Sequence, residues 1–302
     1  MGSATRAFLA GLIDYAGLFP PAALPMDEAV RSYAEYRRGT EAWVLNRFVV
    51  SARRLGEFGE ALSAMPAGLR GAGPWRVTAV AGGDLAADAD SVRDFNGRLG
   101  GTVARVEAME AVARTADEIG RARSAVPEDL GLVLELPLDG DLPALARAAK
   151  AAGARAKIRT GGVTAADFPP ARSVLRFLDA CAAERLSFKA TAGLHHAVRG
   201  PAPLTYEAES AHATMFGYLN VVLAAVALWN GRSAGRVIQI LEDEERDAFQ
   251  PNGNLIVWRS LRFSEEDIAG ARRDFITAIG SCSFTEPLAE FRQLGALLAG
   301  PS

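Results

Sequence analysis

Short apolar runs alternate with longer amphipathic segments along most of this 302-residue chain, and this alternation is the strongest constraint on its fold. The short runs are typical of buried strands, and the segments between them place apolar residues three and four positions apart, as amphipathic helices do. The expected strands are residues 12–18, 43–50, 75–80, 102–108, 132–136, 156–160, 186–191 and 236–241. The expected helices are residues 27–38, 52–64, 86–99, 111–125, 142–152 and 173–184.

Eight strands joined by helical crossovers predict an α/β protein with a closed (β/α)8 barrel, the TIM-barrel architecture, over residues 1–241. An open, doubly wound sheet is the alternative, and it is disfavoured because no GxGxxG turn follows the first expected strand. The alternation stops after residue 241. There we expect a hairpin that turns near Asn252-Gly253, a helix from Ser264 to about Ala278 and a terminal helix ending near Leu298. Residues 242–302 therefore predict a C-terminal extension packed on the barrel.

Composition limits the kinds of molecule that the protein is expected to bind and the cellular compartment in which it is expected to work. The net charge of −3 and the lack of any basic run argue against nucleic-acid binding. The longest apolar segment, residues 216–229, is too short to cross a bilayer and contains Asn220, so a buried helix is expected instead. Cys181 and Cys282 lie far apart in the sequence and predict no disulfide framework, which favours a reducing, cytoplasmic setting. The sequence does not specify an oligomeric state, and it is compatible with a homo-oligomer.

Lysine is rare in this chain. Of 33 basic residues only three are lysines, and two of these, Lys157 in AKIRT and Lys189 in LSFKAT, fall inside strand-like runs. Arginine stays protonated in proteins, whereas a desolvated lysine can lose its proton and become a nucleophile. A structural positive charge in this chain is nearly always an arginine, so the two lysines favour a chemical role.

The polar residues of the strands share one face. Alternate side chains of a barrel strand point into the barrel, and those opposite the apolar positions carry charge. These inward-facing residues are Arg105, Glu107, Glu135, Lys157, Arg159 and Lys189. Most lie toward the carboxyl ends of their strands, where barrel enzymes place their chemistry. A purely structural layer of ion pairs would produce the same pattern and is the competing interpretation.

Two lysines on nearby strands favour one mechanism. A second cation lowers the pKa of the first amine, and the neutral amine can then attack a carbonyl to form a Schiff base. The iminium withdraws electrons from an adjacent carbon–carbon bond, which can then break or form. A carboxylate such as Glu107 could move protons through a water.

These motifs resemble those of deoxyribose-phosphate aldolase, a class I aldolase family of (β/α)8 fold, over roughly residues 11–241. KIRTGG at Lys157 is similar to the family's KTSTG strand, and FKATAG at Lys189 is similar to its second lysine strand. IDYAGL matches the family's first strand through Asp14. Glu107 in RVEAM follows an apolar strand position, as the family's acidic proton-relay residue does. LVLEL is similar to the family's VIIET strand and places Glu135 at its glutamate. The resemblance implies that Lys157 forms the Schiff base and that Lys189 lowers its pKa. It also implies that Glu107 and Asp14 relay protons, without a cofactor or metal.

The chain departs from the family where the substrate would bind. GLHHAVRG follows Lys189 in place of phosphate-binding glycine-rich turns, and Arg159 replaces a small residue, so a phosphosugar is not implied. We expect a small carbonyl substrate. Arg159 and Arg199 could hold a carboxylate or phosphate on it. Gly161 and Gly162 would allow close backbone approach, and His195 or His196 would contact the substrate.

Two other functions remain open from the sequence. The first is a metal-dependent lyase or hydrolase in which His195 or His196 joins His212 and a glutamate around a metal. The second is a non-catalytic barrel that binds a small anionic ligand through Arg159, Arg199 and the histidines.

Overall fold

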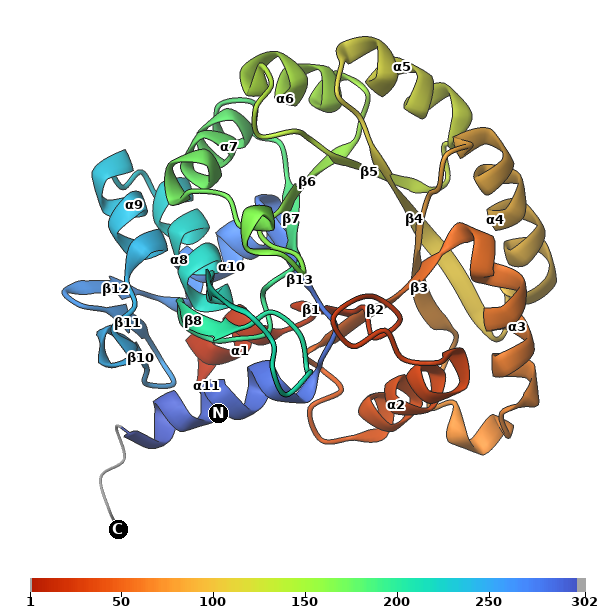
Figure 1. Ribbon diagram of the computed structural model, residues 1–302, viewed down its shortest axis with the longest axis horizontal. Coiled ribbons are helices and arrows are strands. Elements are labelled where there is room, and N and C mark those ends of the chain that lie inside the picture. Colours follow the sequence, from red (N-terminus) through yellow and green to blue (C-terminus); the bar gives the residue numbers. More distant parts are fainter. Residues whose placement is uncertain (1, 298–302) are drawn as a thin grey trace.

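The computed structural model describes residues 2–297 and contains a closed barrel of eight parallel strands (Figure 1). Around the barrel the strands follow the order β1-β13-β7-β6-β5-β4-β3-β2. Their bounds are β1 Ile13–Tyr15, β2 Leu45–Ser51, β3 Trp75–Val80, β4 Ala104–Val112, β5 Gly131–Glu135, β6 Arg155–Arg159, β7 Phe188–Thr191 and β13 Ile276–Ser281. The (β/α)8 fold class expected from the alternation is confirmed.

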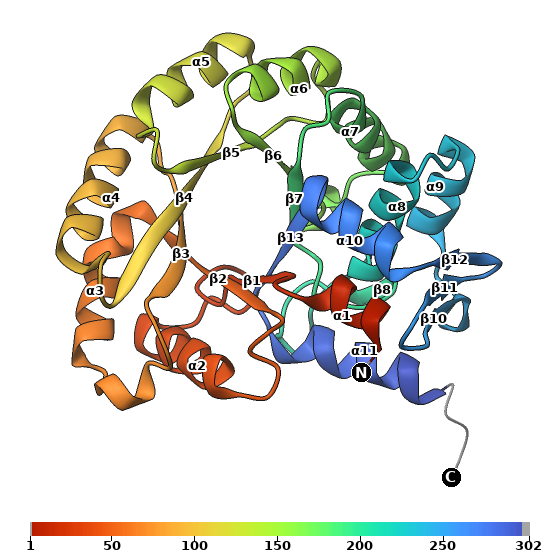
Figure 2. The ribbon, with the colours of Figure 1, turned by 180° about the vertical axis from the view of Figure 1, so that it is seen from behind.

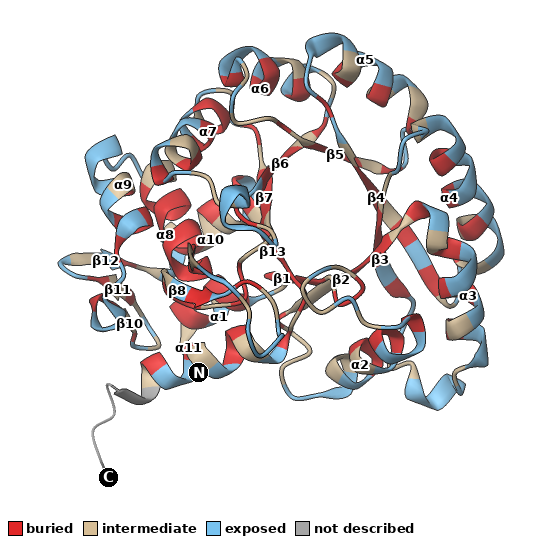
Figure 3. Ribbon diagram, viewed as in Figure 1, coloured by how far each residue is buried: buried red, intermediate tan, exposed pale blue. Residues whose placement is uncertain are grey.

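Helices enclose the barrel in an outer ring, which is seen from both sides in Figures 1 and 2. The helices following the first seven strands are α2 Met26–Arg38, α3 Leu55–Ala64, α4 Leu85–Leu99, α5 Ala116–Ala125, α6 Leu142–Ala151, α7 Ala171–Ala183 and α8 Tyr218–Trp229. Figure 3 shows buried residues on the helix faces that meet the strands and exposed residues on the opposite faces. This amphipathic pattern is the one from which the helices were expected.

Aromatic rings fill the space between β2, β3 and their helices. The ring of Phe48 in β2 stacks on the ring of Phe58 in α3, with 4.9 Å between the ring centroids. The ring centroid of Tyr33 in α2 lies 4.7 Å from that of Trp75 in β3. All four side chains are almost fully buried. The outward faces of the strands therefore form the core, which leaves the inward faces free for polar groups.

The eighth strand is not the one that the sequence suggested. Residues 236–241 belong to α9 (Ala234–Glu242), because the buried residues Val237, Ile240 and Leu241 have helical spacing. The barrel is closed by β13, which hydrogen-bonds to β1 and β7. The expected helix from Ser264 ends early, as α10 (Glu265–Asp274), and β13 follows it directly. The barrel thus includes a strand from the segment assigned to an extension.

A long insertion connects β7 to β13. It contains the hairpin of β8 (Gly200–Pro203) and β9 (His212–Met215), the helices α8 to α10, and a three-stranded sheet. That sheet comprises β10 Phe249–Pro251, β11 Ile256–Trp258 and β12 Leu261–Phe263. The turn expected near Asn252-Gly253 joins β10 to β11, with Gly253 in the left-handed region at φ +88°.

Helices also flank the barrel at both ends of the described chain. α1 (Ser3–Leu9) precedes β1, and α11 (Thr285–Leu297) follows β13, so the expected terminal helix is present, although Leu298 lies outside the described residues. The apolar run at 216–229 forms α8, whose first ten residues are all buried, which confirms the expected core helix. None of the described helices combines the length and apolar character needed to cross a membrane.

Candidate active site

A bulge in β4 determines which of its carboxylates enters the site. Val77 of β3 pairs with Val106, but the next residue, Thr78, pairs with Ala108, so Glu107 is an extra residue in β4. An extra residue reverses the alternation of side chains beyond it. Glu110 therefore points into the barrel, where it is 2% exposed.

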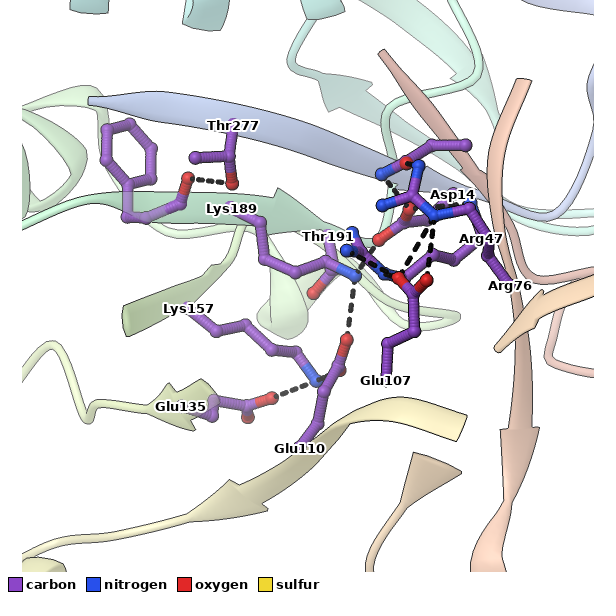
Figure 4. A network of polar contacts seen from close by, with 12 residues as sticks. Asp14, Arg47, Arg76, Glu107, Glu110, Glu135, Lys157, Lys189, Thr191 and Thr277 are labelled. Atoms are coloured by element: carbon purple, nitrogen blue, oxygen red, sulfur yellow. Dashed lines mark hydrogen bonds and ion pairs between the residues drawn. The ribbon is translucent and has the colours of Figure 1, made fainter. Parts of the chain in front are cut away.

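Glu110 joins two lysines at the centre of the barrel (Figure 4). Its Oε2 accepts a hydrogen bond from Lys157 Nζ at 2.7 Å, and its Oε1 accepts one from Lys189 Nζ at 2.7 Å. Lys157 also forms an ion pair with Glu135 at 3.1 Å, and Lys189 donates to Asp14. The two lysines, Glu135 and Asp14 were all expected from the sequence, and the structure brings them together. They come from β6, β7, β5 and β1.

The charges of this cluster control its pKa values. Burial raises the pKa of Glu110, but the ammonium groups of Lys189 and Lys157 outweigh burial and lower it from 4.5 to about 2. Burial lowers the pKa of each lysine, but the adjacent carboxylates outweigh it, so both pKa values are raised. The direction is opposite to the one expected for two neighbouring cations, because the shared carboxylate of Glu110 lies between them.

The lysines form the floor of a cavity of about 360 Å³ at the carboxyl ends of the strands. Glu110, Glu135, Lys157 and Lys189 line it together with the rim of the barrel. Lys157 has 11% of its side chain exposed and Lys189 6%, so both amines are nearly desolvated. This combination of a cavity, buried charge and perturbed pKa values at the catalytic end of a barrel is typical of an active site.

Several predicted binding residues also border this cavity. Arg159, Gly162 and His195 line it. Burial and the neighbouring His196 lower the pKa of His195 to about 4, so its imidazole is neutral at pH 7. Gly161 lies under the Phe168 ring, where a Cβ atom would come within 2.5 Å of that ring.

Four other sequence-derived candidates lie elsewhere. The carboxylate of Glu107 is bound by Arg47 at 2.9 Å and by Arg76 at 3.0 Å, and it contacts neither lysine. His196 is not among the cavity residues, and its Nδ1 pairs with Glu290 at 2.7 Å. Arg199 pairs with Glu244 at 3.3 Å and packs its guanidinium over Phe216. His212 is exposed on β9.

The sequence did not single out Glu110. Strict alternation from Arg105 through Glu107 places Glu110 on the outer face, and the expected strand ended at Ala108. The only available signal was a second glutamate three residues after the first, in RVEAMEAV. A spacing of three can put both carboxylates inside a barrel only if a bulge intervenes.

The three histidines do not assemble a metal centre. Over residues 2–297, no group of three or more histidine, cysteine, aspartate or glutamate side chains has an arrangement that could hold a metal ion. The alternative site of His195 or His196 with His212 and a glutamate is therefore not formed in this structure.

Comparisons with known proteins add no family to this description. No family model matches the chain, and no curated protein matches it either.

Proposed function

We propose that this protein is a class I aldolase-like lyase in which Lys157 forms a Schiff base with a small carbonyl substrate. The observation that carries this proposal is the single carboxylate of Glu110 held between Lys157 and Lys189 on the floor of an accessible cavity. A structural ion-pair layer has no need of a cavity above it. A nucleophilic amine does need one, because the carbonyl must reach Nζ.

Lys157 is the better nucleophile of the two lysines. Its side chain is more exposed than that of Lys189, and its two carboxylate partners, Glu110 and Glu135, both line the cavity. Lys189 is instead held by Asp14 from below, and Asp14 is itself fixed by Asn46 Nδ2 at 2.7 Å. Lys189 therefore remains a cation that positions Glu110.

The reaction begins with a proton transfer. The Lys157 ammonium gives a proton to Glu110 or Glu135, each within hydrogen-bond distance, and the neutral amine attacks the carbonyl carbon. The carbinolamine then takes up a proton on its oxygen and loses water to give the iminium. In the cleavage direction a carboxylate removes the proton from the β-hydroxyl group, and the electrons of the breaking carbon–carbon bond move into the iminium to form an enamine.

Glu110 takes the relay role that the resemblance to deoxyribose-phosphate aldolase implied for Glu107. Glu110 contacts both lysines, whereas Glu107 is occupied by Arg47 and Arg76. Asp14 keeps its implied place in the relay through Lys189.

Borohydride trapping tests the proposal. Borohydride delivers a hydride to the iminium carbon and leaves a stable secondary amine, whose position is found by peptide mass mapping. With a panel of small aldehydes and ketones we expect modification at Lys157. The chain supplies an internal control in Lys150, an exposed lysine of α6 that donates to the Arg185 carbonyl.

The matched variants are Lys157→Arg and Lys150→Arg. We expect Lys157→Arg to abolish trapping and Lys150→Arg to retain it. Adducts that appear only at Lys150, or no adduct with any carbonyl, would show that the proposal is incorrect.

A further inference from the structure

The cavity above Lys157 has two unlike sides. The side formed by β6 and β7 carries the two lysines and Arg159. The side formed by β2, β3 and β4 presents Val49, Val80 and Val112 at the ends of the strands. A ligand that fills the cavity is therefore offered cations on one side and an apolar wall on the other.

Arg159 lies on the same face of β6 as Lys157, two residues closer to the cavity mouth. Its Nε donates to the Gly161 carbonyl at 3.1 Å, which orients the guanidinium and leaves its terminal nitrogens for a ligand. Within residues 2–297, Arg159 forms no salt bridge of 4.0 Å or less. The nearby carboxylate of Asp167 accepts a hydrogen bond from the backbone N–H of Thr164 at 2.9 Å.

The valine side supports a second arm on the carbonyl. Val112, at the end of β4, lines the cavity and is 58% exposed. A substrate substituent that packs against it would remove this apolar surface from water.

On the basis of the Schiff-base function proposed above, we propose that the substrate is a short-chain oxo acid. Arg159 binds its carboxylate, Lys157 binds its carbonyl carbon, and Val49, Val80 and Val112 contact its apolar arm. Arg159 is then a specificity-determining residue, which selects against uncharged ketones.

Two five-carbon probes test this assignment in the borohydride reaction: 4-oxopentanoate and 2-pentanone. We expect 4-oxopentanoate to modify Lys157 at least about tenfold more efficiently than 2-pentanone, because a charged hydrogen bond to Arg159 is gained. A third probe, 4-oxooctanoate, keeps the carboxylate and lengthens the other arm, and we expect it to react at a lower concentration than 4-oxopentanoate.

The variant Arg159→Met isolates the role of the guanidinium. We expect the ratio of trapping by 4-oxopentanoate to trapping by 2-pentanone to fall toward one in Arg159→Met. Arg176→Met, a change on the exposed face of α7, serves as the control and should keep the wild-type ratio.

The outcomes separate this inference from the function on which it rests. Equal trapping of 4-oxopentanoate and 2-pentanone at Lys157, or an unchanged ratio in Arg159→Met, overturns the oxo-acid assignment and leaves the Schiff base intact. No adduct at Lys157 with any probe overturns both.

Discussion

Lys157 and Lys189 are paired residues on neighbouring strands, and their amines bind the two oxygens of one carboxylate. Two cations placed side by side without Glu110 would repel each other, and each would favour loss of a proton from its neighbour. With Glu110 between them, both amines are held protonated in the free protein. Reactivity at Lys157 therefore depends on how readily the carboxylates accept its proton.

We expect trapping at Lys157 to accelerate as the pH rises toward the raised pKa of its amine, because only the neutral amine attacks a carbonyl. Glu135→Gln removes one of the carboxylates that raise this pKa, so the pH profile should shift to lower pH. The measurement is the initial rate of borohydride-dependent modification from pH 6 to pH 10. A profile that keeps its position in Glu135→Gln would contradict the electrostatic explanation.

Glu110 and Glu107 can be compared directly as proton carriers. Glu110→Gln removes a carboxylate that raises the pKa of Lys157, so its pH profile should also shift to lower pH. Its maximal rate of trapping should nevertheless fall by about 10²-fold, because the carboxylate that contacts both lysines is lost as a proton carrier. Glu107→Gln alters a carboxylate bound only by Arg47 and Arg76, so its effect on trapping should be within about twofold once folding is verified by circular dichroism. The reverse ranking would restore the relay role to Glu107.

The sequence predicted the barrel but not all of its interior. Apolar runs located the strands from β1 to β7, because a strand that is buried against the helices needs such a run whichever strands it pairs with. β13 was missed because ITAIGS follows α10 with a single intervening residue, so no turn signal separates the helix from the strand. α9 was taken for a strand because VIQIL is short and apolar, and such runs are ambiguous between the two structures.

The candidate site shows the same limit at a finer scale. Lys157, Lys189, Asp14 and Glu135 were predicted from alternation, rarity and resemblance, and they meet in space. Glu110 could not be predicted, because the direction of its side chain depends on the β4 bulge. That bulge arises in the pairing of β4 with β3, which the sequence of β4 alone does not specify.

The shared carboxylate should also govern stability in acid. The pKa of Glu110 falls from 4.5 to about 2 in the folded protein, so the unfolded chain binds its proton at a higher pH than the folded one. The stabilisation is complete above about pH 4.5 and is lost as the pH falls to about 2. Urea unfolding followed by tryptophan fluorescence should show Glu110→Gln less stable than wild type by roughly 3–5 kcal/mol at pH 7. The difference should shrink below pH 4.5, and a constant difference down to pH 2 would contradict this linkage.

Phe168 packs over two glycines beside the site, and a methyl group at either should displace it. A Cβ on Gly161 would approach the Phe168 ring to 2.5 Å, and one on Gly193, which has φ +69°, would approach it to 2.8 Å. We expect Gly161→Ala to destabilise the protein by about 1–3 kcal/mol, measured as a fall in melting temperature. Gly97→Ala is the control, because its Cβ meets nothing within 4 Å and α4 gains a better helix former.

A second change tests whether the Phe168 ring is the cause. Removing it with Phe168→Ala should make the further change Gly161→Ala nearly neutral, since the clash is then absent. If Gly161→Ala costs the same with and without the ring, the glycine is needed for another reason.

His195 should stay neutral through the physiological range. Burial and His196 lower its pKa to about 4, so the unfolded chain binds the proton first as the pH falls, and stability decreases from about pH 6.5 to about pH 4. Because the chain has only three histidines, their imidazole resonances can be followed one by one by NMR. The variants His195→Gln and His212→Gln assign the resonances, since each variant lacks one of them. We expect the His195 signal to hold its position down to about pH 5. A titration midpoint near pH 6.5 for His195 would show that its imidazole is open to solvent and can become protonated. His195 would then not be a neutral member of the cavity lining.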